Sequence, residues 1–252
     1  MVLGSIFARF VLPPFHRISD EFVFATRKAV RRIMREIPHP CEVHAMATTP
    51  ASQASVEDLN YPAGSLVLLA GLPGAGKSTL LDRLYGLHGD EREPVHTGEA
   101  WVIDSRQSRN WWARYLGPIP PRARIPIVHA THVWRIARAL LGGHSVVAHT
   151  RGTWPHILYG FAWLARRVGS EVHLIMLDVE PRIAREGQRS RGRVVTGATF
   201  ARHCRRWRVL IGRARGGALP PATGVVVLDR PAANLLRAIR FDERRGGEQD
   251  ER

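Results

Sequence analysis

Apolar runs of strand length alternate with segments of helical periodicity from residue 61 onward. Five apolar runs have the length expected of buried strands, and they cover residues 65–70, 101–104, 145–149, 171–178 and 224–229. Apolar residues three and four positions apart predict helices at residues 78–84, 126–141, 155–168, 199–211 and 232–239. Strongly apolar strands that alternate with helices are typical of a parallel sheet covered on both faces. The pattern therefore predicts an α/β domain over residues 59–241.

Polar side chains end the predicted strands, and their position bears on function. In a sheet of this kind, ligands bind beyond the carboxyl ends of the strands. The side chains that stand there in this sequence are Asp104, His149, Asp178 and Asp229. We expect a binding site at this edge.

Residues 1–58 have a different character. Residues 22–37 predict a basic amphipathic helix, and residues 45–57 are rich in small polar residues, as in a linker. Such a helix either contacts a membrane surface or a partner, or is a solvated appendage. Met46 lies close to the predicted domain, and one hypothesis is that translation begins there rather than at Met1. The residues from 242 to 252 form a charged tail.

The high positive charge of the chain suggests a class of partner, but the amino-acid composition weakens that conclusion. A net charge of +15 would favour a nucleic-acid partner or an anionic membrane. Of the 37 basic residues, however, all but Lys28 and Lys77 are arginines, a bias that fits a GC-rich genome. No apolar run approaches the roughly 20 residues of a membrane span. Two cysteines give no disulfide framework and no metal-ligand spacing, so we expect a cytoplasmic protein.

The sequence GLPGAGKS at residues 71–78 matches the P-loop pattern G-x-x-x-x-G-K-[ST]. Because it stands between a predicted strand and a predicted helix, its backbone N–H groups can surround a phosphate at a helix N-terminus. Lys77 would reach the β- and γ-phosphates, and the Ser78 hydroxyl would hold Mg²⁺. The motif predicts binding of ATP with Mg²⁺ by Gly71, Pro73, Gly74, Ala75, Gly76, Lys77, Ser78 and Thr79.

Asp104 is the first candidate catalytic residue beyond the P-loop. A carboxylate after the next strand can accept a proton from a substrate hydroxyl or support Mg²⁺. The alternative is a residue that only caps the following loop. The third strand ends in His149 without a carboxylate, so either Asp104 supports the metal or the site is weakened. The arginines and tryptophans at residues 106–112 suit an anionic or ring-bearing substrate, although the tryptophans can equally belong to the core.

Arginines are concentrated between residues 182 and 215, where eleven of them accompany a single acid. Arg185, Arg189 and Arg193 are four residues apart and would share one helix face. Arginines on a flap over the phosphates would neutralise charge on the transferred phosphoryl group, and Arg189 and Arg193 are the candidates for this catalytic role. The alternative is a solvated basic face.

These features give the chain from about residue 66 to residue 236 a resemblance to known proteins. The residues that carry it are the P-loop with Thr79, Asp104, LDVEP at 177–181 and RSRGR at 189–193. The chain resembles P-loop kinase-like "AAA family ATPase" or ATP-binding proteins, a group similar to zeta-toxin-type, polynucleotide-kinase-type and small-molecule kinases. The resemblance implies a five-stranded sheet in the order 2-3-1-4-5, an arginine-bearing lid and phosphoryl transfer from ATP. No arginine-finger or sensor pattern of ring-forming motors is present in the sequence.

The sequence therefore predicts a P-loop phosphotransferase or ATPase. The first interpretation is a kinase that moves the ATP γ-phosphate to a hydroxyl of an anionic or hydroxyl-bearing small molecule or nucleotide. The alternative is an ATP-dependent protein that binds nucleic acid or a partner and hydrolyses ATP weakly. We do not expect a membrane partner. The sequence does not name the acceptor, the choice between ATP and GTP, or the oligomeric state.

Overall fold

The computed structural model describes residues 57–117, 119–150, 155–192, 195–217, 219 and 221–242. These residues all lie in the unit formed by residues 37–252. The predicted basic helix at 22–37, almost all of the predicted linker and almost all of the charged tail fall outside them. None of the described helices is both long enough and apolar enough to cross a membrane.

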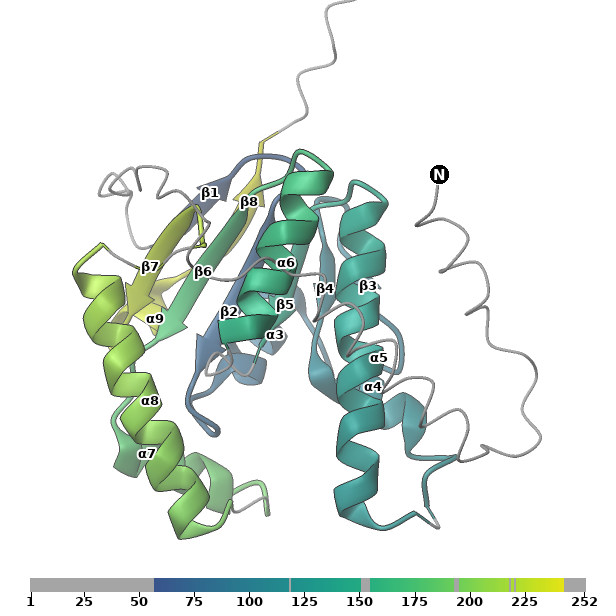
Figure 1. The fold of residues 1–252 in the computed structure, drawn as a ribbon, viewed down its shortest axis with the longest axis vertical. Coiled ribbons are helices and arrows are strands. Elements are labelled where there is room, and N and C mark those ends of the chain that lie inside the picture. Colours follow the sequence, from purple (N-terminus) through teal and green to yellow (C-terminus); the bar gives the residue numbers. More distant parts are fainter. Residues whose placement is uncertain are drawn as a thin grey trace, which may run out of the picture. The chain divides into compact units, whose positions relative to one another are not determined.

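The main sheet has six strands in the order β3-β4-β5-β2-β6-β7 (Figure 1). Its strands are β2 (Leu66–Gly71), β3 (Val95–His96), β4 (Trp101–Ile103), β5 (Val146–His149), β6 (Val172–Leu177) and β7 (Gly224–Leu228). Counted along the chain, the five parallel strands lie in the order 2-3-1-4-5. The predicted number of strands is one too few, because β3 adds an antiparallel edge strand. A strand of two residues, one of them His96, leaves no apolar run to detect.

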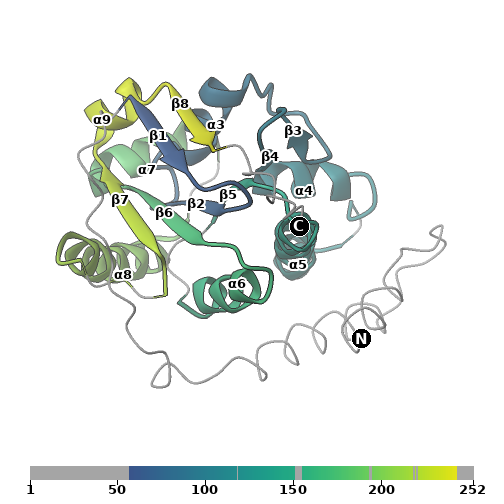
Figure 2. The same cartoon turned by 90° about the horizontal axis from the view of Figure 1, so that it is seen from above.

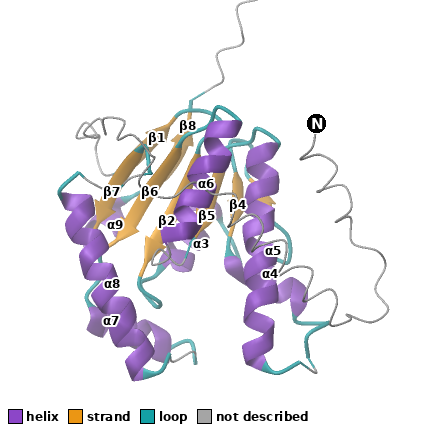
Figure 3. Cartoon of the chain, in the orientation of Figure 1, coloured by secondary structure: helices purple, strands orange, loops and turns teal. Residues whose placement is uncertain are grey.

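Helices cover both faces of this sheet, as Figure 3 shows by secondary structure. Figure 2 shows α5, α6 and α8 on one face, and α3 and α9 on the other. The helices are α3 (Lys77–Tyr85), α4 (Ser105–Trp112), α5 (Pro121–Leu141), α6 (Pro155–Arg167), α7 (Pro181–Arg189), α8 (Gly197–Arg215) and α9 (Arg230–Leu235).

The central strand β2 pairs with β5 on one side and β6 on the other. All of its residues are buried, and Leu66, Val67 and Leu69 have no exposed surface. A strand buried on both faces must be apolar without alternation, which is why this segment reads as a continuous apolar run. The core therefore fixes the strand that leads into the P-loop.

A second, two-stranded sheet pairs β1 (Asp58–Tyr61) with β8 (Ala238–Phe241) in parallel. The predicted helix at 232–239 is therefore wrong in its second half, because α9 ends at Leu235. In β8 the Ile239 side chain is buried and its neighbour Arg240 is exposed, the period-two pattern of a strand. The partner strand lies about 180 residues earlier in the sequence, so a local pattern could not reveal it.

The parallel strands of the main sheet all end at one edge. In Figure 1 they run downward, and α4 and α7 lie beyond their carboxyl ends together with the loop that follows β2. This edge brings together the P-loop after β2, Asp104 after β4 and Thr150 after β5. Neither α4 nor α7 was predicted as an element of its own, yet both contribute to the site.

Candidate active site

The P-loop adopts a conformation that requires glycine at two positions. Gly74 and Gly76 have φ angles of 89° and 94°, a region that residues with a Cβ atom rarely adopt. Gly76 is also the N-cap of α3, so the loop leads directly into the helix N-terminus. The Ala75 N–H donates to the Leu72 carbonyl at 3.0 Å and closes the turn. The sequence between β2 and α3 thus has the shape that phosphate binding needs.

Lys77 lies inside this loop. Its side chain is buried, and Nζ donates to the carbonyl oxygens of Gly71 and Leu72, each at 2.9 Å. These bonds hold the ammonium group within the loop, where the β- and γ-phosphates of a bound nucleotide would lie.

Asp104 caps α4, which confirms the capping alternative without excluding a catalytic one. Its Oδ1 accepts from the Arg106 N–H at 2.7 Å, and its own N–H donates to Gln107 Oε1 at 3.0 Å. This capping box fixes the rotamer of a side chain that is only 1% exposed. The carboxylate is therefore rigidly placed at the end of β4.

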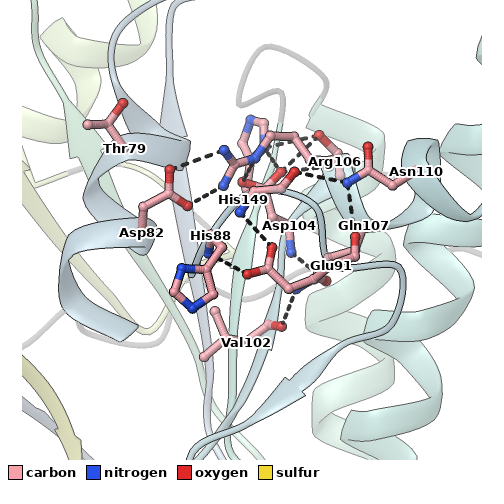
Figure 4. A network of polar contacts seen from close by, with 12 residues as sticks. Thr79, Asp82, His88, Glu91, Val102, Asp104, Arg106, Gln107, Asn110 and His149 are labelled. Carbon is pink, nitrogen blue, oxygen red and sulfur yellow. Dashed lines mark hydrogen bonds and ion pairs between the residues drawn. The ribbon is translucent and has the colours of Figure 1, made fainter. Parts of the chain in front are cut away.

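The charge of Asp104 is held by groups from three elements (Figure 4). His149 Nδ1 lies 3.5 Å from Oδ1, and Arg106 Nε lies 3.3 Å from Oδ2. Burial alone would raise the pKa of this carboxyl, but hydrogen bonds from His149, the Arg106 backbone and Ser78 hold the pKa well below its usual range. Asp104 is therefore a carboxylate at neutral pH, and the P-loop residue Ser78 is one of the groups that lower its pKa.

Arg106 joins α4 to α3. Its Nη1 donates to Asp82 Oδ2 at 3.1 Å, and Nη2 contacts Asp82 Oδ1, while Nε faces Asp104 (Figure 4). The sequence suggested that this arginine binds substrate. Its partners instead make it a clamp between the P-loop helix and the helix that carries Asp104.

The protein groups present fit a magnesium ion bound with a nucleotide. Asp104 Oδ2 is buried and accepts no hydrogen bond within the described residues. The same carboxylate lies against Ser78, the other predicted metal-supporting residue. Among the described residues no group of three or more His, Cys, Asp or Glu gathers to hold a metal alone. Mg²⁺ usually takes one or two protein ligands together with phosphate oxygens and waters, and Ser78 and Asp104 match that requirement.

The other two acids at strand ends have structural partners. Asp178 pairs with Arg215 at 2.8 Å, and Asp229 caps α9 by accepting from the Ala232 N–H at 2.8 Å. Of the acids that end strands, Asp104 is the one that contacts the P-loop.

The helix α7 packs directly on the P-loop, a contact that sequence analysis missed. Gln188 is buried, and its Nε2 donates to the Pro73 carbonyl at 2.9 Å while its Oε1 accepts from the Val195 N–H at 3.0 Å. A Cβ atom added to Gly187 would lie 2.6 Å from the Gly74 carbonyl oxygen. A glycine inside an amphipathic helix was the available signal of this close approach.

The structure describes the arginines after β6 only in part. Arg185 and Arg189 lie four residues apart in α7, with Arg189 exposed at its end, and Arg193 lies outside the described residues. The Arg185 guanidinium lies 5.2 Å from the ring centroid of Phe200. Among the described arginines of this stretch, Arg191 reaches the P-loop, where Nη2 donates to the Thr79 hydroxyl.

A cavity of about 420 Å³ opens beside Asp104, and we call it the acceptor cavity. It extends over α4, α5, α6 and the end of β5, with Ser105 and His149 at the Asp104 side. The Ser105 hydroxyl lies 3.2 Å from His149 Nδ1 and 3.5 Å from Asp104 Oδ1. Its full lining is Ser105, Arg109, Trp112, Ala113, Leu116, Arg124, Ile125, Val128, His129, His132, Val133, Ile136, His149, Thr150, Ile157 and Phe161.

The cavity explains what the arginines and tryptophans after Asp104 do. Trp112 forms part of the cavity wall, and its Nε1 donates to Thr131 Oγ1 at 2.8 Å. Trp111 packs edge-on against Trp112, with 4.6 Å between the ring centroids. Arg109 also lines the cavity. Arg109 and Trp112 thus lie at a cavity, and Trp112 is also buried, as the core alternative expects; a role in substrate binding stays a prediction.

His132 holds the backbone of His149 in place by a hydrogen bond. Its Nε2 donates to the His149 carbonyl oxygen at 2.7 Å, and its side chain is buried. Burial, together with the neighbouring His149, lowers the pKa of His132 to about 3. The imidazole is therefore neutral and works as a hydrogen-bonding support for the end of β5.

No protein-family model and no curated protein matches this sequence. Among solved structures, one from the PezAT chromosomal toxin–antitoxin system of Streptococcus pneumoniae is similar, with 14% identity and a TM-score of 0.48, covering 86% of this chain and 81% of that chain. The tunicamycin resistance protein of Deinococcus radiodurans has 12% identity, a TM-score of 0.43 and coverages of 68% and 92%. A gluconokinase from Sinorhizobium meliloti has 14% identity, a TM-score of 0.41 and coverages of 70% and 90%.

The TM-scores of these three structures lie below 0.5, so the fold assignment rests on the topology of the sheet and on the conformation of the P-loop in this chain.

Proposed function

We propose that this protein is a kinase that transfers the γ-phosphate of ATP to a hydroxyl of a small molecule. One observation carries the proposal. The buried Asp104 carboxylate lies between the P-loop, where Ser78 contributes to lowering its pKa, and the Ser105–His149 end of the acceptor cavity. A phosphate site and a cavity that share one buried carboxylate are the arrangement that phosphoryl transfer requires.

Transfer of the phosphoryl group forms one bond to the γ-phosphorus and breaks another. The oxygen of the acceptor hydroxyl forms a bond to the γ-phosphorus, and the bond from that phosphorus to the β–γ bridging oxygen breaks. ADP leaves with the electron pair, and the hydroxyl proton passes toward the Asp104 carboxylate and on to water. Because the pKa of Asp104 lies well below its usual range, we assign this group to orienting the hydroxyl and supporting the metal rather than to storing the proton.

Other residues of this chain supply charge around the phosphates. Lys77 would turn from the Gly71 and Leu72 carbonyls toward the β- and γ-phosphates. Arg191, already beside Thr79, is better placed than Arg189 to neutralise the transferred group. Mg²⁺ held at Ser78 and Asp104 would supply further neutralisation of phosphate charge.

The test is the fate of γ-labelled ATP incubated with Mg²⁺, the protein and a cell extract. The extract is then separated into small molecules, nucleic acid, protein and free phosphate. We expect label in the small-molecule fraction with wild type and none with Lys77→Ala. Label that stays on ATP, or leaves only as free phosphate, would contradict the proposal.

A second candidate function rests on the surface of α8. Six of its arginines are exposed and the helix contains no acid; the six are Arg202, Arg205, Arg206, Arg208, Arg213 and Arg215. Such a face suits the phosphates of nucleic acid, and an ATP-dependent binding protein would use it. Replacing Arg202, Arg205 and Arg206 with Gln would then weaken RNA or DNA binding and flatten its salt dependence. Unchanged binding in that triple variant would remove this candidate.

A further inference from the structure

The acceptor cavity carries a charge pattern that restricts what it can bind. Its polar lining contains two arginines, three histidines, a serine and a threonine, and among the described residues no aspartate or glutamate lines it. The Asp104 carboxylate lies just behind the Ser105–His149 end. At the opposite end, next to Arg124, a cationic ligand group would meet like charge and an anionic group would meet favourable potential.

Arg124 is the positive group with the best-defined environment. Its Nη2 donates to the Gly117 carbonyl at 2.7 Å, and its Nε donates to the Ile119 carbonyl. Carbonyl partners orient a guanidinium but do not cancel its charge. These bonds use two of the five N–H donors of the guanidinium. Arg124 is thus an oriented cation at the cavity wall.

The two ends of the cavity are separated along α5. Arg124 precedes His132 by eight residues, and His132 is bonded to the end of β5 beside Asp104. Eight residues of helix correspond to about 12 Å of rise. A ligand with its hydroxyl near Asp104 and an acidic group at Arg124 must therefore extend along α5.

The wall between these ends is apolar. Its side chains come from α4, α5 and α6, and they include Trp112, Leu116, Val128, Val133, Ile157 and Phe161. Hydroxyl groups placed against this wall would lose their hydrogen bonds to water without finding new partners. A volume of 420 Å³ lies near the lower end of the roughly 300–1,000 Å³ range of small-molecule pockets.

We propose that the acceptor is a small hydroxyl compound with an acidic group at its far end and an apolar ring or chain between the two. The hydroxyl lies at the Ser105–His149 end, and the acidic group pairs with Arg124. The identity of the hydroxyl as the phosphoryl acceptor rests on the proposed kinase function. The preference for an acidic, apolar ligand does not, because it follows from the cavity.

Calorimetric binding without nucleotide tests this preference. The probes are two matched sets, each with one acidic, one neutral and one cationic member. The first set is 8-hydroxyoctanoate, 1,8-octanediol and 8-amino-1-octanol, and the second is 4-(hydroxymethyl)benzoate with its hydroxymethyl and aminomethyl counterparts. We expect the acidic chain compound to bind about tenfold tighter than the diol, and the amine not to bind. Equal binding of all three, or tighter binding of the amine, would overturn the charge assignment.

Substitutions in the cavity lining test where the probes bind. Arg124→Gln should remove the preference for the acid, whereas Arg124→Lys, which keeps the charge, should retain most of it. Val128→Phe should abolish binding by filling the cavity, and Ala113→Phe does the same from an exposed position if Val128→Phe fails to fold. Binding that survives a folded cavity-filling variant, or saturable binding by none of the probes, would overturn the site.

The ligand preference of the cavity and the proposed kinase function can be tested separately. Lys77→Ala should bind the acidic probe as wild type does, because the P-loop does not line the cavity. An acidic probe that binds but accepts no label from ATP in the wild type would leave the cavity preference standing and count against the kinase.

Discussion

The nucleotide side and the acceptor side of the site are built in opposite ways. The proposed nucleotide side comes from nine consecutive residues, 71–79, whose glycines and backbone N–H groups would surround the phosphates. The acceptor cavity draws residues from positions 105 to 161, and most of them are apolar side chains that meet only in the folded protein. A P-loop is common to many proteins and can be recognised in the sequence. The side chains that would select an acceptor come together only in the folded protein, so they cannot be recognised in the same way.

The largest effect should come from the nucleotide side. Replacing Lys77 with Ala removes the ammonium that contacts the phosphates, and we expect phosphoryl transfer to fall by at least about 100-fold. The matched control is Lys28→Ala, since Lys28 is the other lysine of the chain and lies outside the predicted site. Turnover with labelled ATP measures both. Similar losses in the two variants would show that the effect is not specific to the P-loop.

Asp104 joins the two sides, so its replacement should affect both. Asp104→Asn keeps a side chain that can cap α4 but removes the charge that faces Ser78. We expect kcat to fall by about 100-fold and the Mg²⁺ concentration needed for half-maximal activity to rise by about tenfold.

The control for this variant is Asp229→Asn, because Asp229 also follows a strand and caps a helix but has no contact with the P-loop among the described residues. It should leave the Mg²⁺ dependence unchanged. An Asp104→Asn protein with wild-type Mg²⁺ dependence would show that this carboxylate does not support the metal.

The contact between α7 and the P-loop can be broken at Gly187. Replacing this glycine with Ala would normally stabilise a helix by up to about 1 kcal/mol. Here the new Cβ would lie 2.6 Å from the Gly74 carbonyl oxygen, so we expect a loss of about 1–3 kcal/mol and weaker ATP binding.

Gly212→Ala in α8 is the matched control, because nothing lies within 4 Å of its added Cβ. It should stabilise the protein or leave its stability unchanged. Urea unfolding and ATP titration compare the two variants. If both substitutions shift stability in the same direction, α7 does not press on the P-loop as described.

The smallest effect concerns His132 on the acceptor side. Burial lowers its pKa from 6.5 to about 3, so below pH 6.5 the unfolded chain binds a proton that the folded protein does not. The stability that depends on neutral His132 is complete above pH 6.5 and is lost as the pH falls toward 3. At pH 5 the loss should be about 2 kcal/mol.

His132→Gln keeps an N–H that can donate to the His149 carbonyl but does not titrate. Its unfolding free energy should therefore fall less than that of wild type between pH 7 and pH 5. His129, His149 and Asp104 contribute to the field at His132 in both proteins. The same pH dependence in both would contradict the assignment.

Features encoded within a few consecutive residues could be predicted from the sequence, and features that depend on distant residues could not. The P-loop and the five parallel strands were predictable because glycine spacing and buried apolar runs are encoded within a few residues. The pairing of β1 with β8 and the two-residue strand β3 depend on partners distant in the sequence or on too few residues to show a period. The same limit applied to the last predicted helix, half of which is a strand.

Within the site, Asp104 could be singled out from its place at a strand end, and its catalytic role stays a prediction. The structure adds that its carboxylate is buried, caps α4 and has a lowered pKa. The roles of Arg191 and Gln188 could not be predicted, because eleven arginines share one region and a buried glutamine gives no pattern of its own. Their positions depend on how α7 packs against the P-loop.

The most direct test of the central claim compares transfer and nucleotide binding in one pair of proteins. Wild type and Val128→Phe are given labelled ATP, Mg²⁺ and the small-molecule fraction of an extract, and ATP affinity is measured alongside. If an acceptor cavity and a P-loop site meet at Asp104, Val128→Phe will bind ATP as wild type does and lose transfer to the small molecule. Transfer that is undiminished in the folded Val128→Phe protein would contradict the account.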